Sequence, residues 1–162
     1  FSLSRGLGDV YKRQGPISLI NAMNKVQSQN VSSTASISMA ASVEALNGDQ
    51  SFILSNNESF LRRRNLVVKH LNETPGLSCR TPEGAFYVFA SCKGVLGKTT
   101  ESGKKLLTDG DFMDYLLEEV GVAGVQGSAF GLEGFFRISY ATSDSILEDA
   151  CQRIKTACSK LS

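Results

Sequence analysis

Arg137 is the residue whose type and position point most directly to chemistry. It lies in the segment FFRISY, where a strand would turn successive side chains to opposite faces among aromatic neighbours. A guanidinium is permanently charged, and its planar fork of donors meets both oxygens of a carboxylate at once. We therefore expect Arg137 either to bind a carboxylate or to lie on the water-exposed face of an edge strand.

The segment GSAFG, residues 127–131, comes shortly before this strand. Its small residues, Gly127, Ser128 and Gly131, let backbone N–H groups approach a ligand closely. The glycine spacing fits neither the dinucleotide-binding fingerprint nor the P-loop, and no helix is expected to follow. The segment is either a loop that shapes a pocket or only a turn.

The segment PEGAFY, residues 82–87, combines a turn fixed by Pro82 with an aromatic pair that enters a strand. Phe86 or Tyr87 could lie against a flat ligand, and the alternative is that both belong to the core.

Basic residues elsewhere give weaker signals. Three consecutive residues of a helix spread over about 200° of arc, so Arg62, Arg63 and Arg64 are not expected to converge on one anion, and a solvated helix face is expected instead. His70 lies on the same expected helix without a carboxylate or nucleophile in a known pattern, which favours a structural histidine.

The cysteines do not form a metal-binding pattern. None of the four lies in a C-x-x-C pair, and the single histidine has no metal-ligand spacing, so no metal site is expected. Cys151 and Cys158 share a helix face about 10 Å apart, which is too far for a disulfide. We expect reduced thiols that face the core.

Composition narrows the class of protein. The 162 residues are 41% apolar and 20% charged with a net charge of +1, which is typical of a folded chain in water. No apolar run approaches the ~18 residues of a membrane span, no secretion signal is visible, and no basic field is present to hold nucleic acid. We expect a cytoplasmic protein that binds neither membrane nor nucleic acid.

Periodicity predicts an α/β chain, and the elements that must position these residues follow from it. Helices are expected at 16–27, from Ser36 or Ser38 to 47, at 57–72, at 112–120 and at 145–161, the last with a capping box of Ser145 and Glu148. Strands are expected at 77–80, 86–91, 122–125 and 135–141. Residues 93–108 are expected to form an exposed, mobile loop, and residues 1–14 show no regular period.

Several segments occur in an order that carries a resemblance. They are GP-x-x-LI-x-AM-x-K-x-QSQ, ASVEALNGDQ, RRR-x-LVV, PEGAFYVF, GSAFG and FRISYA. Together they closely resemble the C-terminal part of pyridoxal-phosphate-dependent class I aminotransferases of the bacterial aspartate aminotransferase type. The resemblance runs from Gly15 to about Ser162.

The resemblance implies a fold, a reaction and a site. The fold is the end of the large domain (15–48) and the small domain (49–162) of a fold type I transferase, which is a homodimer in the parent enzyme. The reaction moves an amino group between an amino acid, aspartate or another, and a 2-oxo acid, with pyridoxal 5'-phosphate as cofactor. Arg137 matches the arginine that binds the substrate α-carboxylate, Phe86 an aromatic of the active-site wall, and residues 127–131 a loop that shapes the pocket.

Departures from the family concern catalysis. The position of the Schiff-base lysine is Phe1 and that of a cofactor-anchoring arginine is Asp9, so no catalytic residue is assigned and this chain alone is expected to be inactive. Ser33-Thr34, Met39 and Gln126 also replace residues common in relatives. The segment GDVYKRQ resembles strings at the ends of translated sequencing reads, so residues 1–14 are either a non-native scar or a native leader.

A different class of function remains open. The chain could be a non-catalytic α/β module that folds alone and uses Arg137 to bind a carboxylate ligand or a partner protein. Independent stability would distinguish this module from a fragment, whose helices between residues 16 and 46 would expose apolar side chains.

Overall fold

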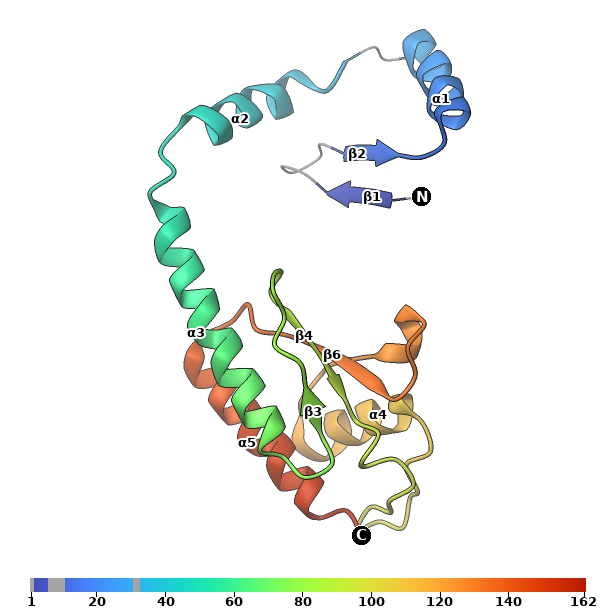
Figure 1. The fold of residues 1–162 in the computed structure, drawn as a ribbon, viewed down its shortest axis with the longest axis vertical. Coiled ribbons are helices and arrows are strands. Elements are labelled where there is room, and N and C mark those ends of the chain that lie inside the picture. Colours follow the sequence, from blue (N-terminus) through green and yellow to red (C-terminus); the bar gives the residue numbers. More distant parts are fainter. Residues whose placement is uncertain (1, 6–10, 31–32) are drawn as a thin grey trace. The chain divides into compact units, whose positions relative to one another are not determined.

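The computed structural model describes residues 2–5, 11–30 and 33–162, with side chains from residue 15 onward, and it combines helices with two antiparallel sheets (Figure 1). The expected α/β class is confirmed. The chain divides into two compact units, one up to Phe52 and one from Ile53, and each is described by itself.

The first unit contains two strands and two helices. Strand β1 (Ser2–Arg5) pairs antiparallel with β2 (Tyr11–Gln14), and helices α1 (Ile17–Asn30) and α2 (Ser36–Asn47) follow. Residues 1–14 show no regular period in the sequence, yet this pairing forms, because ladder hydrogen bonds join backbone groups and do not require an alternating sequence. The positions of Phe1 and Asp9 lie outside the described residues.

Helix α2 differs from expectation at its start. Its N-cap is Ala35, which makes no side-chain capping bond, and Ser36 and Ser38 both lie inside the helix. The expected serine cap was wrong, and no residue of α1 or α2 is buried. Ile37 and Leu46 are 84% and 73% exposed, so α2 presents apolar side chains to water in this chain.

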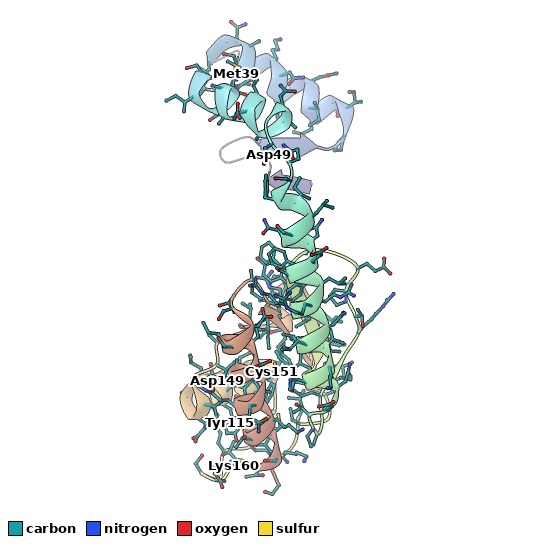
Figure 2. The ribbon with its side chains drawn as sticks, turned by 90° about the vertical axis from the view of Figure 1, so that its left-hand side faces the viewer. Met39, Asp49, Tyr115, Asp149, Cys151 and Lys160 are labelled. Atoms are coloured by element: carbon teal, nitrogen blue, oxygen red, sulfur yellow. The ribbon has the colours of Figure 1, made fainter. Side chains whose placement is uncertain are left out.

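The second unit is a four-stranded sheet with helices on one face. The strand order is β3 (Ser78–Cys79), β4 (Tyr87–Ser91), β6 (Phe135–Ser139) and β5 (Val125–Gln126), and every neighbouring pair is antiparallel. The helices are α3 (Phe52–Asn72), α4 (Asp109–Val120) and α5 (Asp144–Ser159). Figures 1 and 2 show α3 and α5 lying side by side.

The core lies between the helices and one face of this sheet. Phe136 of β6 meets Phe112 of α4 edge-to-face at 5.5 Å between ring centres, and both rings are fully buried. The buried tyrosine of α4, Tyr115, donates its hydroxyl to the carbonyl of Ala157 on α5 at 3.0 Å. The alternate residues of β4 and β6 are half-buried or exposed, because they lie on the other face of the sheet, which α3, α4 and α5 do not cover.

Residues 93–108 form an anchored segment, contrary to expectation. Val95 and Leu106 have no exposed surface, and the Leu106 N–H donates to the Lys98 carbonyl at 2.9 Å. Thr99 and Ser162 exchange backbone hydrogen bonds of 2.8 and 3.1 Å. The prediction of an exposed loop was wrong at Val95 and Leu106, because isolated apolar residues without a period can still be buried by distant parts of the chain.

The last helix confirms its predicted apolar seam but not its predicted cap. Leu147, Cys151, Ile154, Cys158 and Leu161 are all buried. The N-cap is Ser143, whose hydroxyl accepts from the Ile146 N–H, so Ser145 lies inside the helix and the predicted capping box was wrong.

All four cysteines are free and buried, which confirms that they face the core. Burial raises the pKa of the Cys79, Cys92 and Cys151 thiols to about 11 and that of Cys158 to about 12. These thiols are therefore protonated and weakly nucleophilic near neutral pH.

Two arginines of α3 converge on one carboxylate, against the sequence-based expectation. The Nε atoms of Arg62 and Arg63 lie 2.7 and 2.8 Å from the two oxygens of Asp144 at the start of α5. The angle of about 200° spanned by three consecutive helix positions did not predict this convergence, because an arginine side chain is long enough to reach around the helix. Arg64 instead donates to the Pro82 carbonyl at 3.1 Å.

Candidate carboxylate-binding site

Arg137 lies at the centre of the open face of the sheet. It is the middle residue of β6, and its Cα is paired with Phe89 of β4 on one side and Val125 of β5 on the other. Because β6 is an inner strand, the alternative that placed Arg137 on an edge strand does not hold. The side chain is half-buried, and its face alternates with that of the buried Phe136.

The guanidinium of Arg137 is held between two aromatic rings. Its central carbon lies 4.3 Å from the centre of the Tyr87 ring and 4.4 Å from that of the Phe130 ring. Both contacts have the geometry of cation–π interactions, which restrict rotation of the head group without occupying its N–H donors. Among the described residues, no carboxylate or carbonyl makes a hydrogen bond to this guanidinium, so its donors are available to a ligand.

Other rings extend this aromatic surface. Phe89 stacks on Phe135 at 5.7 Å with an interplanar angle of 13°, and it meets Phe130 edge-to-face at 6.0 Å. The Nζ atom of Lys93 lies 5.1 Å from the centre of the Phe135 ring. The face therefore presents two cations on an apolar support, an environment that favours an anion with an apolar body.

Phe86 lies beside this surface. Its ring is 41% exposed and contacts Tyr87 at 4.3 Å and Phe60 at 6.4 Å between centres. Tyr87, and not Phe86, is the aromatic residue of this segment that contacts Arg137.

The turn before Phe86 is fixed by distant residues. Ala85 has a φ of 62°, a backbone conformation that is uncommon for a residue other than glycine. The Tyr140 hydroxyl donates to the Ala85 carbonyl at 2.8 Å, and burial raises the pKa of this phenol, so it remains a donor at neutral pH. A pocket of about 380 Å³ lies next to the turn and is lined by Arg80, Thr81, Pro82, Glu83, Tyr87 and Phe89.

Gly127 and Ser128 begin a single turn of 3₁₀ helix, η1 (Gly127–Phe130), which carries Phe130, and Gly131 is its C-cap. Gly127 is buried, and a Cβ atom there would meet the Leu132 carbonyl and would lie 2.8 Å from the Phe135 Cβ atom. The Ser128 N–H donates to the Asp109 carboxylate at 2.6 Å, and Gly131 ends the turn with a φ of 78°. These residues thus set the position of the Phe130 ring.

Two further observations concern other kinds of site. Within residues 2–5, 11–30 and 33–162, no group of three His, Cys, Asp or Glu side chains is placed to hold a metal ion. No helix in the described part of the chain is long and apolar enough to cross a membrane.

Comparison with known families decides where this chain belongs. The sequence model of the family described as aminotransferase class I and II matches residues 6–154. The chain belongs to this family. As an aminotransferase chain it carries Arg137, Tyr87 and Phe130 within the matched residues.

Similar proteins are aminotransferases that are longer than this chain. The aspartate aminotransferase of Rhizobium meliloti (strain 1021) is 61% identical over 148 residues, which are 91% of this chain and 36% of that protein. The aspartate/prephenate aminotransferase of Cereibacter sphaeroides is 52% identical over 148 residues, 91% of this chain and 37% of that protein. The chain thus spans little more than a third of these relatives.

Solved structures support the same fold for this aminotransferase chain. A crystal structure of the Rhizobium meliloti aspartate aminotransferase matches with a TM-score of 0.82, over 91% of this chain and 37% of that one, at 61% identity. The Thermus thermophilus aspartate aminotransferase with maleate matches with a TM-score of 0.71 at 33% identity, over 88% of this chain and 35% of that one. The fold type I α/β architecture is therefore shown by both sequence and structure.

Sequence reasoning did not identify Phe130 or Asp109 as partners in this site. Phe130 belongs to the motif GSAFG, but its contact with Arg137 depends on how η1 folds back over the sheet. Asp109 lies far from this motif in sequence, at the start of α4. Strand alternation, in contrast, could have placed Tyr87 on the same face as Phe89, because they are two residues apart.

Proposed function

We propose that this chain is part of a pyridoxal-phosphate-dependent aminotransferase that moves an amino group between an amino acid and a 2-oxo acid. In this proposal, residues 15–48 belong to the end of the large domain, residues 49–162 form the small domain, and the parent enzyme is a cytoplasmic homodimer. The observation that supports it most directly is the guanidinium of Arg137, held between Tyr87 and Phe130 with its donors available.

Arg137 binds the substrate α-carboxylate in this proposal. A guanidinium can donate two parallel hydrogen bonds to the two carboxylate oxygens, which fixes the orientation of the carboxylate as well as its position. The rings of Tyr87 and Phe130 limit the directions in which the fork can point. Phe86 contributes to the wall of the same pocket, and Gly127, Ser128 and Gly131 shape its edge.

The substrate class follows from relatives that carry the same segment. They are named as aspartate and aspartate/prephenate aminotransferases, and one solved relative holds maleate, a dicarboxylate. We infer that aspartate, or another amino acid with a second acidic group, is the amino donor. Maleate is a suitable probe, because it carries carboxylates but has no amino group to transfer.

Pyridoxal phosphate supplies the electron-withdrawing ring of the reaction when it is bound. By the resemblance, the residues of this chain do not fit it, since Phe1 stands where its aldehyde needs a lysine and Asp9 where a cofactor-anchoring arginine would lie. Lys160 pairs with Glu101 at 2.9 Å, Lys98 donates to the Leu161 carbonyl, and Lys93 lies over Phe135. We therefore assign the cofactor site to parts of the parent enzyme outside this chain.

A chimera tests the proposed function. Residues 15–162 would replace the matching segment of the Rhizobium meliloti aspartate aminotransferase, and transamination from aspartate to a 2-oxo acid would be measured. We expect activity, and we expect Arg137→Lys to lower kcat/KM at least about tenfold, because lysine cannot make the paired hydrogen bonds. Arg153→Lys, on the exposed side of α5, is the matched control and should change little.

An active chimera that tolerates Arg137→Lys without loss would refute the assigned role. A folded chimera with no activity would argue against the aminotransferase proposal itself. The second unit contains Arg137, Tyr87 and Phe130 together, which favours the carboxylate-binding module as the second candidate. Stabilisation of this chain by an amino acid in a thermal unfolding experiment, together with an inactive chimera, would support that candidate.

A further inference from the structure

The position of the Phe130 ring determines how the Arg137 guanidinium is held. Two rings of the described side chains flank the head group, and they come from different kinds of element. Tyr87 belongs to β4, which is fixed by its ladder with β6, whereas Phe130 is the last residue of the short turn η1 and is 48% exposed. The orientation of the arginine therefore depends on what holds η1.

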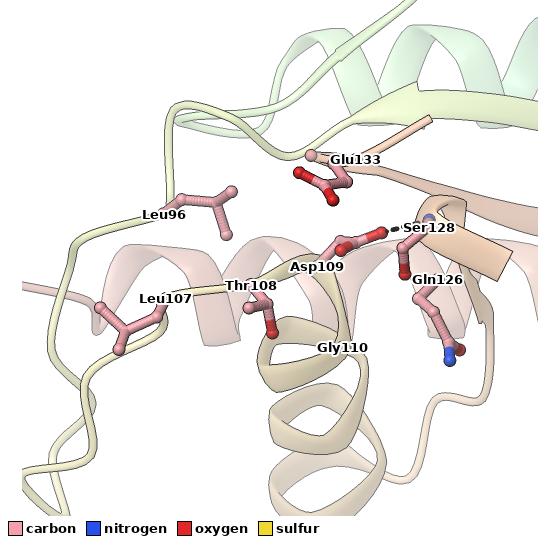
Figure 3. Close-up of a pocket in the computed structure, with 9 residues that line it drawn as sticks. Leu96, Leu107, Thr108, Asp109, Gly110, Gln126, Ser128 and Glu133 are labelled. Carbon is pink, nitrogen blue, oxygen red and sulfur yellow. Dashed lines mark hydrogen bonds between the residues drawn. The ribbon is translucent and has the colours of Figure 1, made fainter. Parts of the chain in front are cut away.

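The hydrogen bonds within η1 leave the N–H groups at the start of the turn without acceptors. The Gly131 N–H donates to the Ser128 carbonyl and the Leu132 N–H to the Gly127 carbonyl, so both of these carbonyls accept a hydrogen bond. The first N–H groups of any helical turn have no acceptor within it. In η1 the Ser128 N–H is such a group, and it donates to Oδ2 of Asp109 at 2.6 Å (Figure 3).

Asp109 is well suited to hold this turn. Its residue surface is 3% exposed, and it lies in the first turn of α4, where the helix dipole favours a negative charge. A hydrogen bond to a buried carboxylate is strong, because breaking it would leave the carboxylate without a hydrogen-bond donor. Among the residues that the structure describes, this is the only side-chain hydrogen bond to η1.

The surroundings leave space into which η1 could move. A pocket of about 320 Å³ lies beside the bond, and Asp109, Ser128, Gln126 and Glu133 are among its lining residues (Figure 3). Close packing therefore does not hold η1 in position on this side, and the hydrogen bond from Ser128 to the Asp109 carboxylate holds it instead.

We propose that Asp109 is a positioning residue for carboxylate binding, and that it acts through Ser128 and the Phe130 ring to orient the guanidinium of Arg137. The proposal rests on the proposed function, because it concerns the same carboxylate site. Asp109 does not contact the ligand. Its loss releases η1, withdraws the Phe130 ring and lets the guanidinium rotate.

The test uses the full 162-residue chain and two readouts. The first is the NMR shift of the Arg137 Nε–H group, which the Phe130 ring current displaces, together with the hydrogen-exchange rate of the Ser128 amide. The second is the affinity for maleate. Phe130→Leu is the reference in which the ring is absent, and we expect Asp109→Ala to move the Arg137 resonance to the position it has there. We also expect Asp109→Ala to weaken maleate binding at least about fivefold, which is only a part of the usual contribution of a charged hydrogen bond.

Two further variants separate positioning from stability. Asp109→Asn keeps the shape of the side chain and an acceptor oxygen, so we expect intermediate values and a folded protein. Asp111→Asn removes the capping carboxylate that accepts from Thr108 on the same helix, so it lowers the stability of α4 without touching Ser128. It should lower Tm but leave the Arg137 resonance and the maleate affinity unchanged.

The outcomes distinguish the two proposals. An unchanged Arg137 resonance in both Asp109 variants would overturn the positioning role, as would an equal effect of Asp111→Asn. If the resonance moves as expected but the unaltered chain does not bind maleate, the positioning of Arg137 stands and carboxylate binding by this chain fails.

Discussion

The guanidinium carbon of Arg137 lies 4.3 Å above the centre of the Tyr87 ring, although the two residues belong to different strands. Their side chains meet because both alternate onto the sheet face opposite the buried Val88 and Phe136. An arginine on a bare sheet face would be free to move into water. The Tyr87 ring instead holds the guanidinium close to the face of the sheet without occupying its N–H donors.

The first prediction concerns this ring. Replacing Tyr87 with Leu should weaken maleate binding by this chain about threefold, because a partly exposed cation–π contact contributes about 0.5–1 kcal/mol. Tyr87→Phe keeps the aromatic face and should bind maleate as the unaltered chain does. Titration followed by NMR would measure both, and equal losses in the two variants would show that the hydroxyl matters instead.

The second prediction concerns the glycine that begins η1. Gly127→Ala would press a methyl group against the Leu132 carbonyl and the Phe135 side chain and should lower the free energy of unfolding by about 1–3 kcal/mol. Gly84→Ala is the matched control, because nothing lies within 4 Å of an added Cβ atom there. Urea unfolding of the two variants compares them, and equal stability would contradict the close packing of η1.

The third prediction concerns acid stability. Hydrogen bonds from Arg62 and Arg63 lower the pKa of Asp144 from 3.8 to about 2 in the folded chain. Because the folded pKa lies below the unfolded one, this contribution is complete above about pH 4 and is lost as the pH falls towards 2. Asp144→Asn should therefore lower Tm at about pH 6 and make little difference at about pH 2. A Tm difference that does not depend on pH would contradict this account.

The fourth prediction concerns the cofactor. This chain alone, mixed with pyridoxal phosphate and treated with borohydride, should show no stoichiometric labelling at one lysine. Phe1 stands where the resemblance places the Schiff-base lysine, and the lysines at 93, 98 and 160 make other contacts. Peptide mapping by mass spectrometry would detect the label, and one fully labelled lysine would show that the chain has its own cofactor site.

Regular periods in the sequence were sufficient to predict the core of the second unit. The apolar seam of α5 and the alternation through Phe136 and Arg137 follow from local spacing, and both were predicted. Arg137 itself could be singled out because a charge within an aromatic strand needs a partner or water.

Contacts between distant residues account for what the sequence did not predict. Arg62 and Arg63 meet Asp144 only because α3 and α5 lie side by side. Ser143 caps α5 although Ser145 has the better local pattern, and the Asp109 bond to Ser128 joins two elements that no repeat or motif connects. Such pairs depend on the packed fold, so a single sequence does not specify them.

The paired backbone bonds between Thr99 and Ser162 have a practical consequence for handling this protein. They join Ser162 to residues 93–108, the segment that follows β4. Deleting Ser162 would remove both bonds and loosen this segment around the buried Val95 and Leu106. Any change made near this residue should therefore leave its backbone in place.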